Sequence, residues 1–555
     1  MGFMKPKEYF KECFVFDLKA GFITAIVALP LAIAFALASG VEPITGIYTA
    51  IVAGILASSI GGSRFSITGP TAAMTIIILS TVNKYGIEGL LLAGFLAGLI
   101  QVSLGLIKIG RLIKYIPLPV VSGFTAGIGI IIFIGQIPNF FGLSIPAKEH
   151  VWQTIAEIFR QIGSASFIAV LIAAATLAIL VFFPRILAKS RHLKIFPASF
   201  FALVLSTSAV FLLGLMIPKV GLIPSALPKF NLISFNLELV RNVLPTAFTV
   251  ALLGAIESLL CAVVCDGMTN TKHDSNRELV AQGATNMALP FLGGMPATAA
   301  IARSAVNVKE GAKTRISGVI HGLFLLIIML FLAPVAMFIP KAFLAGVLMF
   351  VSFRLINFHE VKTIVGISKS ETTVFAITLI LTVVTDLVFA VQVGMAMAVF
   401  LIIYKFSNLT EINHLSDYDP NTEINRIINE DPTLKNNVAI YTMNGPFFFG
   451  AMNIFERKLN EHIHSGKKFI ILRMKHVPFM DSTAIVRINS FLMERQKKNS
   501  KVFLSTLHPG VKKILFKDED FKRLFSKDSV FETTQDAVNF IKKNYLASDN
   551  PSKTI

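Results

Sequence analysis

The sequence predicts a polytopic α-helical membrane protein that ends in a small soluble α/β domain. Three observations support this fold class. Hydrophobic residues make up 54% of the 555-residue chain, long apolar segments follow one another between residues 21 and 406, and strand and helix patterns alternate after them. Only 15% of the residues are charged, whereas a soluble globular domain carries about 25%.

Residues 1–18 are expected to form a cytoplasmic N-terminus that leads into a retained first membrane segment. The first 19 residues carry Lys5, Lys7, Lys11 and Lys19, and the apolar run that follows them is too long for the core of a signal peptide. No small-residue cleavage site follows, so we expect the segment to remain in the protein.

The region 19–406 is expected to form a transmembrane domain of 14 segments. We place them at 21–39, 44–60, 69–83, 86–107, 118–137, 165–183, 196–217, 245–265, 279–292, 296–307, 315–337, 340–353, 372–387 and 389–406. A helix needs about 20 residues to cross a bilayer. The third, ninth and tenth segments are shorter, which indicates broken helices.

The distribution of basic residues predicts that both termini are cytoplasmic. Loops assigned to the cytoplasmic side carry 16 Lys and Arg residues, and loops on the opposite side carry 7. This is the asymmetry that sets membrane orientation. The net charge of +18 is scattered between apolar segments, so we expect no nucleic-acid partner.

Two similar sequence stretches, seven segments apart, divide the 14 segments into a 7+7 inverted repeat. Gly61-Gly62 leads into Thr68-Gly69-Pro70-Thr71 at the start of segment three, and Gly293-Gly294 leads into Met295-Pro296-Ala297-Thr298 at the start of segment ten. Pro is well tolerated in the first helical turn, so we expect helices to begin at these prolines. An odd number of segments per repeat places the copies in opposite orientations. The bland alternative is that Gly-Pro pairs are common in membrane helices.

The two broken segments predict an anion site at the bilayer midplane. Backbone N–H groups in a first helical turn lack helical partners, and the helix dipole adds partial positive charge. Two helix N-termini that meet inside the membrane would therefore form a binding site for an anion. Thr71 and Thr298 could add hydroxyl donors, or they could simply bond to their own helices.

Two charged residues lie at membrane depth, where an ionised side chain is costly. Arg303 is expected about two turns into segment ten, where it would attract the anion, pair with Glu257 or reach the membrane surface. Glu257 in segment eight could carry a proton, bind Na⁺ or balance Arg303.

Phe35 follows Pro30 in the first segment and could line the pocket. A Pro kink exposes backbone carbonyls, but a single Phe among 48 is more often a packing residue.

No catalytic set, cofactor motif or metal-ligand spacing emerges, so we expect no enzyme. His273 and His321 are isolated in the sequence, and the three cysteines form no disulfide framework.

The C-terminal part is expected to contain a linker at 407–435, an α/β domain at 436–546 and a disordered tail at 547–555. Strands at 438–449, 467–477 and 501–507 alternate with helices, which is typical of βαβ units with a largely parallel sheet.

The chain resembles the sulfate permease (SulP) anion transporters, also called solute carrier family twenty-six. The resemblance rests on Gly46-Ile47-Tyr48-Thr49, on 62–71 (GSRFSITGPT) and on 300–304 (AIARS). The C-terminal domain resembles the STAS domain that closes this family's chains. The stretches 254–264 and 266–269 look most like the DauA-like bacterial dicarboxylic acid transporters.

The resemblance implies core and gate domains, a homodimer, and a bacterial inner (plasma) membrane location. It implies a small anion substrate, held by the first, third, eighth and tenth segments. The expected substrate-binding residues are Phe35, Thr71, Ala72, Thr298, Ala302 and Arg303, with Glu257 as the ion-coupling residue.

Two positions bear on coupling and regulation. Sodium-coupled bicarbonate members of the family carry Asp and a hydroxyl residue where this chain has Glu257 and Cys261, which favours a proton over Na⁺. Ser482 matches the serine that is phosphorylated in anti-sigma-factor antagonists, but we favour the interpretation that Asp481 or Ser482 is a helix N-cap.

The sequence therefore predicts a secondary active transporter for a C4-dicarboxylate or a sulfate-type anion, with proton symport and an elevator-like movement. A sodium-coupled bicarbonate transporter, and an anion channel or sensor with a cytoplasmic partner at its STAS domain, are the alternatives. A nucleobase transporter of the same fold would carry a carboxylate where this chain has Arg303, and it would lack a STAS domain.

Overall fold

The computed structural model divides into two compact units, Met1–Ala396 and Met397–Ile555. It describes residues 6–110, 117–145, 151–187, 197–228, 230–233, 235–385, 387–415, 423–452, 457, 467–497, 499–525 and 529–546. The tail expected to be disordered, 547–555, lies outside the described residues.

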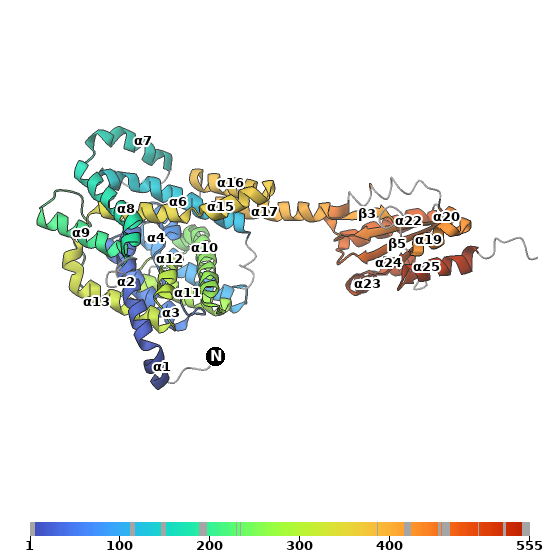
Figure 1. Cartoon of the computed structure of the whole chain (residues 1–555), viewed down its shortest axis with the longest axis horizontal. Coiled ribbons are helices and arrows are strands. Elements are labelled where there is room, and N and C mark those ends of the chain that lie inside the picture. The colour runs from blue at the N-terminus through green and yellow to red at the C-terminus, as the bar shows by residue number, and fades with distance from the viewer. Residues whose placement is uncertain are drawn as a thin grey trace, which may run out of the picture. The chain divides into compact units, whose positions relative to one another are not determined.

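Each predicted membrane segment corresponds to a helix (Figure 1). The helices of the first unit are α1 (Pro6–Glu12), α2 (Phe14–Ala38), α3 (Pro43–Ile60), α4 (Ala72–Leu106), α6 (Leu118–Phe141), α7 (Val151–Gln161), α8 (Phe167–Leu187), α9 (Ala198–Leu212), α10 (Leu237–Thr269), α11 (Ser275–Ala288), α12 (Ile301–Lys309), α13 (Ile316–Ala336), α14 (Lys341–Leu355), α15 (Phe358–Ile367) and α16 (Lys369–Val384). Helix α17 (Leu387–Asn408) begins in the first unit and ends in the second. Among the described residues, nine helical stretches are long and apolar enough to cross a membrane.

The helix α4 contains two of the predicted segments. Gly86 separates them with φ 68° and ψ −172°, a conformation that lies outside the helical region and that glycine adopts readily. Helix α4 is therefore broken by a kink at Gly86. Three helices, α1, α7 and α15, were not expected from hydropathy, because they are short and, in α7, largely exposed.

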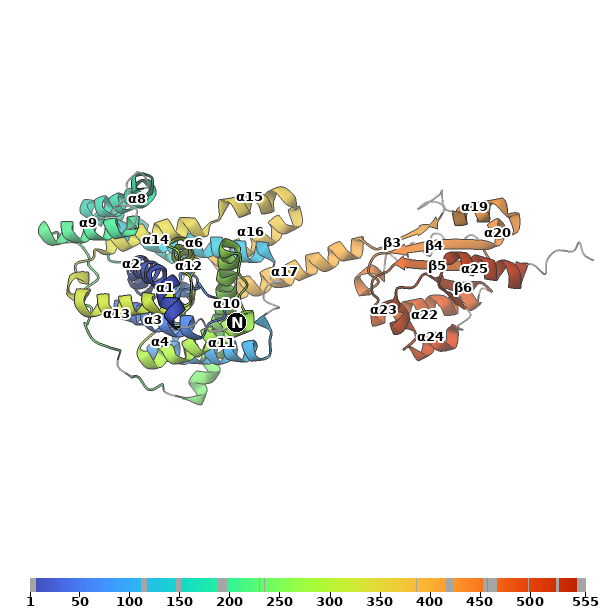
Figure 2. The ribbon, with the colours of Figure 1, turned by 60° about the horizontal axis from the view of Figure 1, so that its bottom comes forward.

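The membrane helices pack in two groups, which Figure 2 shows as two layers. In the first group α4 packs against α10 and α11, and α13 packs against α2 and α3. In the second group α6 packs against α14 and α16, and α8 packs against α9 and α14. These groups match the expected core and gate domains, and we use those names for them. The earlier helices of each sequence repeat belong to the first group and the later helices to the second, so neither group is continuous in sequence.

The second unit contains a five-stranded sheet in the order β3-β4-β5-β6-β7. Its strands are β3 (Glu411–His414), β4 (Val438–Asn444), β5 (Phe469–His476), β6 (Lys501–Ser505) and β7 (Val530–Phe531), and its main helices are α19 (Glu423–Glu430), α20 (Pro432–Asn437), α22 (Ser482–Lys497), α23 (Pro509–Leu515), α24 (Glu519–Leu524) and α25 (Thr534–Ile541). The last four strands are parallel, as the βαβ pattern predicts.

The expected linker at 407–435 differs from what the structure contains. Its residues Glu411–His414 form β3, which pairs antiparallel with β4, and its later residues form α19 and the start of α20. The polar, acidic composition concealed this edge strand, in which one residue, Ile412, is fully buried. The β4 side chains alternate between two apolar clusters, so helices cover both faces of the sheet.

Candidate functional site

Two extended segments cross inside the core domain, and a helix begins directly after each one. Thr68 pairs with Ala299 and Gly69 pairs with Thr298 in a two-stranded antiparallel ladder of β1 (Thr68–Gly69) and β2 (Thr298–Ala299). Helix α4 starts at Ala72 and helix α12 at Ile301. The antiparallel pairing is the relation that an inverted repeat requires.

The structure corrects where the second helix begins. We expected a helix from Pro296, but Ala300 is the N-cap of α12, and Pro296 lies in the preceding extended chain. Arg303 is therefore in the first turn of α12 and not two turns into it. Pro70 likewise precedes Thr71, the N-cap of α4.

The correction also changes which residues are symmetry equivalents. Gly69 and Thr298 pair with one another, and each lies two positions before its N-cap. Thr71 therefore corresponds to Ala300, whereas the two similar sequence stretches had matched Thr71 with Thr298. The two threonines meet because of the crossing and not because they occupy equivalent positions.

Side chains of the neighbouring helices hold the extended segments in place. Inside a membrane, backbone groups outside a helix need partners from the protein. Ser304 Oγ accepts from Ile67 N at 2.8 Å, and Ser258 Oγ accepts from Ala299 N at 3.2 Å. Ala300 N donates to Ile67 O at 2.9 Å. These contacts fix the crossing from α10 and α12.

Helix α11 holds the segment before the crossing. The Glu278 carboxylate is 2% exposed and accepts from Gly62 N at 2.8 Å and Ser63 N at 2.9 Å. Gln282 Nε2 donates to Thr68 Oγ1 at 2.7 Å. We did not select either residue from the sequence, although a Glu and a Gln four positions apart in a membrane segment are a signal of such a role.

Glu257 on α10 lies where the two repeats meet. Its Oε2 accepts from Thr298 Oγ1 at 2.6 Å and from Thr71 Oγ1 at 3.0 Å. The two hydroxyl oxygens lie 3.0 Å apart. The carboxylate is half-buried, while the threonines are buried. The structure therefore brings together three of the residues selected from the sequence.

Arg303 reaches across the crossing to the other repeat. Its guanidinium is 1% exposed, and Nη2 donates to Pro70 O at 2.6 Å. A Cβ at Gly69 would lie 2.6 Å from Nη1, so glycine is needed for this close approach. Among the described residues, no ion pair joins Arg303 to Glu257, and Nη1 has no hydrogen-bond partner. The cation is held in the site without being neutralised there by direct contact.

The remaining selected residues have different environments. Ala302 is exposed and Ile301 is 41% exposed, so the first turn of α12 reaches the surface. Ala72, at the start of α4, is 5% exposed. Phe35 is 4% exposed and belongs to the apolar core cluster, where it packs without polar contacts.

His273 is not isolated, contrary to the sequence-based expectation. Its Nδ1 lies 2.7 Å from Asp266 Oδ2, and its Nε2 lies 3.0 Å from Ser275 Oγ. Asp266 also accepts from His273 N and Thr271 Oγ1. Asp266 lies in the last turn of α10 and Ser275 begins α11, so these bonds tie the connecting residues Thr271 and His273 to both helices. Within the described ranges, no cluster of three His, Cys, Asp or Glu residues could hold a metal ion.

Comparisons with known proteins agree with this architecture. The sequence model of the sulfate permease family matches residues 14–378, and the STAS domain model matches residues 431–537. The putative sulfate transporter YvdB of Bacillus subtilis is 38% identical over 526 residues, which cover 93% of this chain and 96% of that protein. The bicarbonate transporter BicA of Synechocystis is 32% identical over 553 residues, with 97% and 96% coverage.

Two solved structures resemble the chain. The overall structure of SLC26A9 has a TM-score of 0.85, covers 98% of this chain and 92% of its own, and is 19% identical, which shows the fold alone. The transmembrane domain of a cyanobacterial bicarbonate transporter BicA has a TM-score of 0.62 at 31% identity, with 70% and 97% coverage.

Proposed function

The chain belongs to the sulfate permease family of anion transporters, and from this membership we propose that it carries a small oxyanion or C4-dicarboxylate by proton symport. The observation that supports the proposal is the meeting of Glu257, Thr71 and Thr298 between two helix N-termini, with Arg303 beside them.

The charges of this site link anion binding to protonation. Two helix N-termini and Arg303 give the site positive potential, which the ionised Glu257 carboxylate offsets. A proton on Glu257 removes that negative charge and leaves the site positive. Because the anion then binds more tightly, the proton also binds more tightly when the anion is present. This reciprocity is what symport requires.

The crossing also suits an elevator-like movement. The ladder of β1 and β2, together with Arg303, ties both half-helices into one unit. The anion contacts therefore travel with the core domain when it moves against the gate domain. We propose that the protein works as a homodimer with both termini in the cytoplasm, in a bacterial inner (plasma) membrane.

The direct test is uptake of labelled sulfate, fumarate and bicarbonate into proteoliposomes, with and without an inward proton gradient. We expect at least one anion to accumulate, and the gradient to raise its uptake severalfold. In Glu257→Gln, which keeps the shape without the titrating group, the gradient should have no effect while exchange of anion across the membrane continues. Glu157→Gln, on the exposed helix α7, is the matched control.

Two outcomes would contradict the proposal. Uptake of none of the three anions under any gradient removes the transport function. A gradient effect that survives in Glu257→Gln removes the assignment of the coupling residue. Ion currents far above carrier rates would instead favour a channel.

A second candidate is a sodium-coupled bicarbonate transporter, because BicA of Synechocystis is 32% identical to this chain. Cys261 argues against sodium here: its thiol donates to Ser304 Oγ at 3.1 Å, and sulfur is a poor ligand for this hard cation. Replacing Na⁺ by choline in the uptake assay separates the two candidates.

A further inference from the structure

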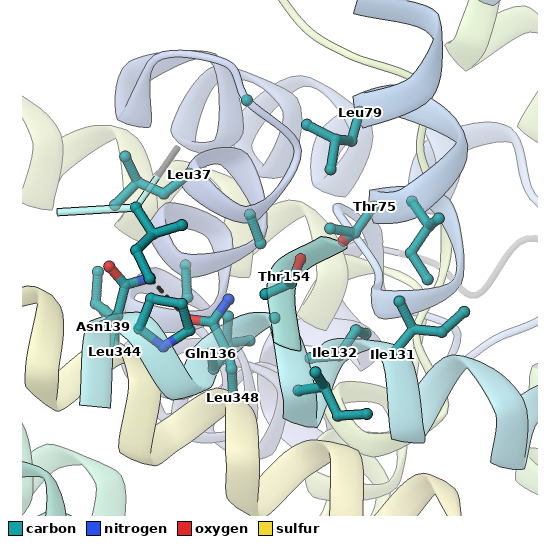
Figure 3. Close-up of a pocket in the computed structure, with 18 of the residues that line it drawn as sticks. Leu37, Thr75, Leu79, Ile131, Ile132, Gln136, Asn139, Thr154, Leu344 and Leu348 are labelled. Carbon is teal, nitrogen blue, oxygen red and sulfur yellow. Dashed lines mark hydrogen bonds between the residues drawn. The ribbon is translucent and has the colours of Figure 1, made fainter. Parts of the chain in front are cut away.

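A cavity of about 340 Å³ lies between the core and gate domains, outside the crossing described above. Its core side is formed by the end of α2 and the first turns of α4, and its gate side by α6, α7 and α14. Figure 3 shows side chains from these helices converging on it. The volume falls within the range of small-molecule sites.

The gate side of the cavity presents a buried amide without an acceptor. Gln136 on α6 is 6% exposed, and its Oε1 accepts from Asn139 Nδ2 at 3.1 Å. This bond turns the Gln136 Nε2 donor away from Asn139 and toward Thr154 (Figure 3). No described residue accepts from Nε2, and the hydroxyl of Thr154, 8% exposed, also lacks a protein partner among them. Because both groups line the cavity and no described protein group bonds to them, they are available to hydrogen-bond an oxygen acceptor that enters it.

The charge of the lining selects an anion. Lys341 is the single charged residue among the described residues that line the cavity, and they include no Asp or Glu. Lys341 is also the first residue of α14, and its N–H donates to Pro218 O at 2.9 Å. The lining therefore carries one positively charged residue and no compensating carboxylate among the described residues.

The cavity adjoins the substrate site through α4. Thr75 lines the cavity, and its Oγ1 donates to Thr71 O at 3.1 Å, one helical turn earlier. Thr71 is the residue whose hydroxyl contacts Glu257. An anion in the cavity is thus separated from the site by one turn of helix.

We propose that this cavity is a second anion site, in which Gln136, Thr154 and Lys341 hold a sulfate or carboxylate group before it moves to the crossing. The inference rests on the proposed transport function and adds a gate-side contribution to it. Gln136 determines specificity here, because its N–H suits an oxygen acceptor and its aliphatic neighbours Ile132 and Leu348 limit the volume of the anion.

The test uses the full chain and four variants. Gln136→Glu places a carboxylate against the anion, Lys341→Gln removes the cation, and Lys341→Arg restores it. Lys219→Gln is the matched control: its backbone bridges to Pro340, and its side chain lies over Phe338 rather than in the cavity. If Gln136→Glu does not fold, the two Lys341 variants decide the question.

Two readouts separate this site from the proposed function. The first is the KM of anion uptake. The second is the fluorescence of Trp152, the single tryptophan of the chain, which lies on α7 two residues before Thr154. Purified protein is titrated with sodium sulfate, bicarbonate and succinate at constant pH and ionic strength.

We expect Gln136→Glu and Lys341→Gln to raise both KM and the fluorescence midpoint at least fivefold, with maximal uptake within twofold of wild type. Lys341→Arg and Lys219→Gln should stay near wild-type values. Unchanged KM and midpoint in both cavity variants, or an equal rise in Lys219→Gln, overturns the second site and leaves the transport function standing. If wild type takes up none of the anions, the transport function fails, and the titration alone decides whether the cavity binds them.

Discussion

The helix ends at the crossing differ from those of the C-terminal domain in how their first N–H groups are satisfied. In the described part of the chain, neither Thr71 nor Ala300 caps its own helix through a side chain. In the second unit, Asp431 caps α20 by accepting from Thr433 N and Leu434 N. Both regions contain helix starts of ordinary geometry, but the second region satisfies its donors internally.

The difference indicates that the first backbone N–H groups of α4 and α12 remain available to a ligand at the crossing. Thr71 could cap α4, yet its hydroxyl contacts Glu257 and Thr298 instead. A capped helix end gains about 1 kcal/mol of stability, and that gain is absent at α4 and α12. The positive ends of both helices thus remain unneutralised by their own side chains, which suits an exchangeable anion.

The largest effect should come from Arg303→Met, which removes the cation beside the uncapped ends. We expect anion uptake to fall at least about 100-fold, since loss of a buried charge from a charge-assisted contact is worth 2–5 kcal/mol. Arg303→Lys should keep part of the activity. Proteoliposome uptake provides the measurement.

Lys309→Met is the control for Arg303, because it removes an exposed cation from the last turn of the same helix. Uptake in Lys309→Met should stay within twofold of wild type. Full uptake by Arg303→Met would mean that the guanidinium only supports Pro70 O and does not act on the anion.

A side-chain cap introduced at the start of α12 should satisfy its first N–H groups, as Asp431 does for α20, and should weaken anion binding. Ala300→Asp places a carboxylate where it can accept from the first N–H groups of α12 and offset the helix dipole. We expect a 10- to 100-fold rise (about 1.4–2.7 kcal/mol) in the KM for anion uptake, together with a more stable protein in thermal unfolding.

Ser368→Asp provides the comparison for Ala300→Asp. Ser368 is the N-cap of the gate helix α16 and, like Ala300, makes no side-chain cap. The same acidic substitution there should leave KM unchanged. An equal rise in both variants would attribute the effect to net charge rather than to the end of α12.

The two threonines should differ in a graded way. The Thr298 hydroxyl lies 2.6 Å from Glu257 Oε2 and the Thr71 hydroxyl 3.0 Å from it. Hydrogen bonds to charged groups contribute about 1.5–3 kcal/mol, so we expect Thr298→Val to lower proton-coupled uptake about tenfold and Thr71→Val less. Serine at either position should restore uptake. Equal wild-type uptake in both valine variants would contradict a role for this contact.

The smallest effect concerns the capped end. The hydrogen bond from Lys542, at 2.8 Å, and those from Thr433 lower the pKa of Asp431 to about 2, from an ordinary 3.8. The resulting stabilisation is present above pH 4 and is lost as the pH falls through 2. Because the Lys542 side chain is 58% exposed, solvent limits the ion pair to about 0.5 kcal/mol.

Asp431→Asn keeps a capping oxygen and removes the charge. In the full chain, we expect hydrogen exchange of the α20 amides to quicken about twofold at pH 7, and the difference from wild type to disappear near pH 2. The amides of α24, capped by Asp518, should not change. A difference that persists at pH 2 would assign the effect to something other than the carboxylate.

The periodicity and composition of the sequence already determined much of this protein. Each apolar run became a helix because burial of apolar side chains and backbone pairing in a membrane leave a helix as the stable form. Glu257 and Arg303 could be selected from the sequence because a charged side chain is costly to place inside a membrane. The parallel strands of the C-terminal domain followed from local alternation.

Only the tertiary structure decided how the repeats meet. The pairing of Gly69 with Thr298 joins residues far apart in the chain, so no local pattern could set its register. That register moved the start of α12 to Ile301, placed Arg303 against Pro70, and put Glu257 between Thr71 and Thr298 rather than in an ion pair. The sequence determined which segments are helical and which residues are costly to bury, and long-range packing determined what those residues contact.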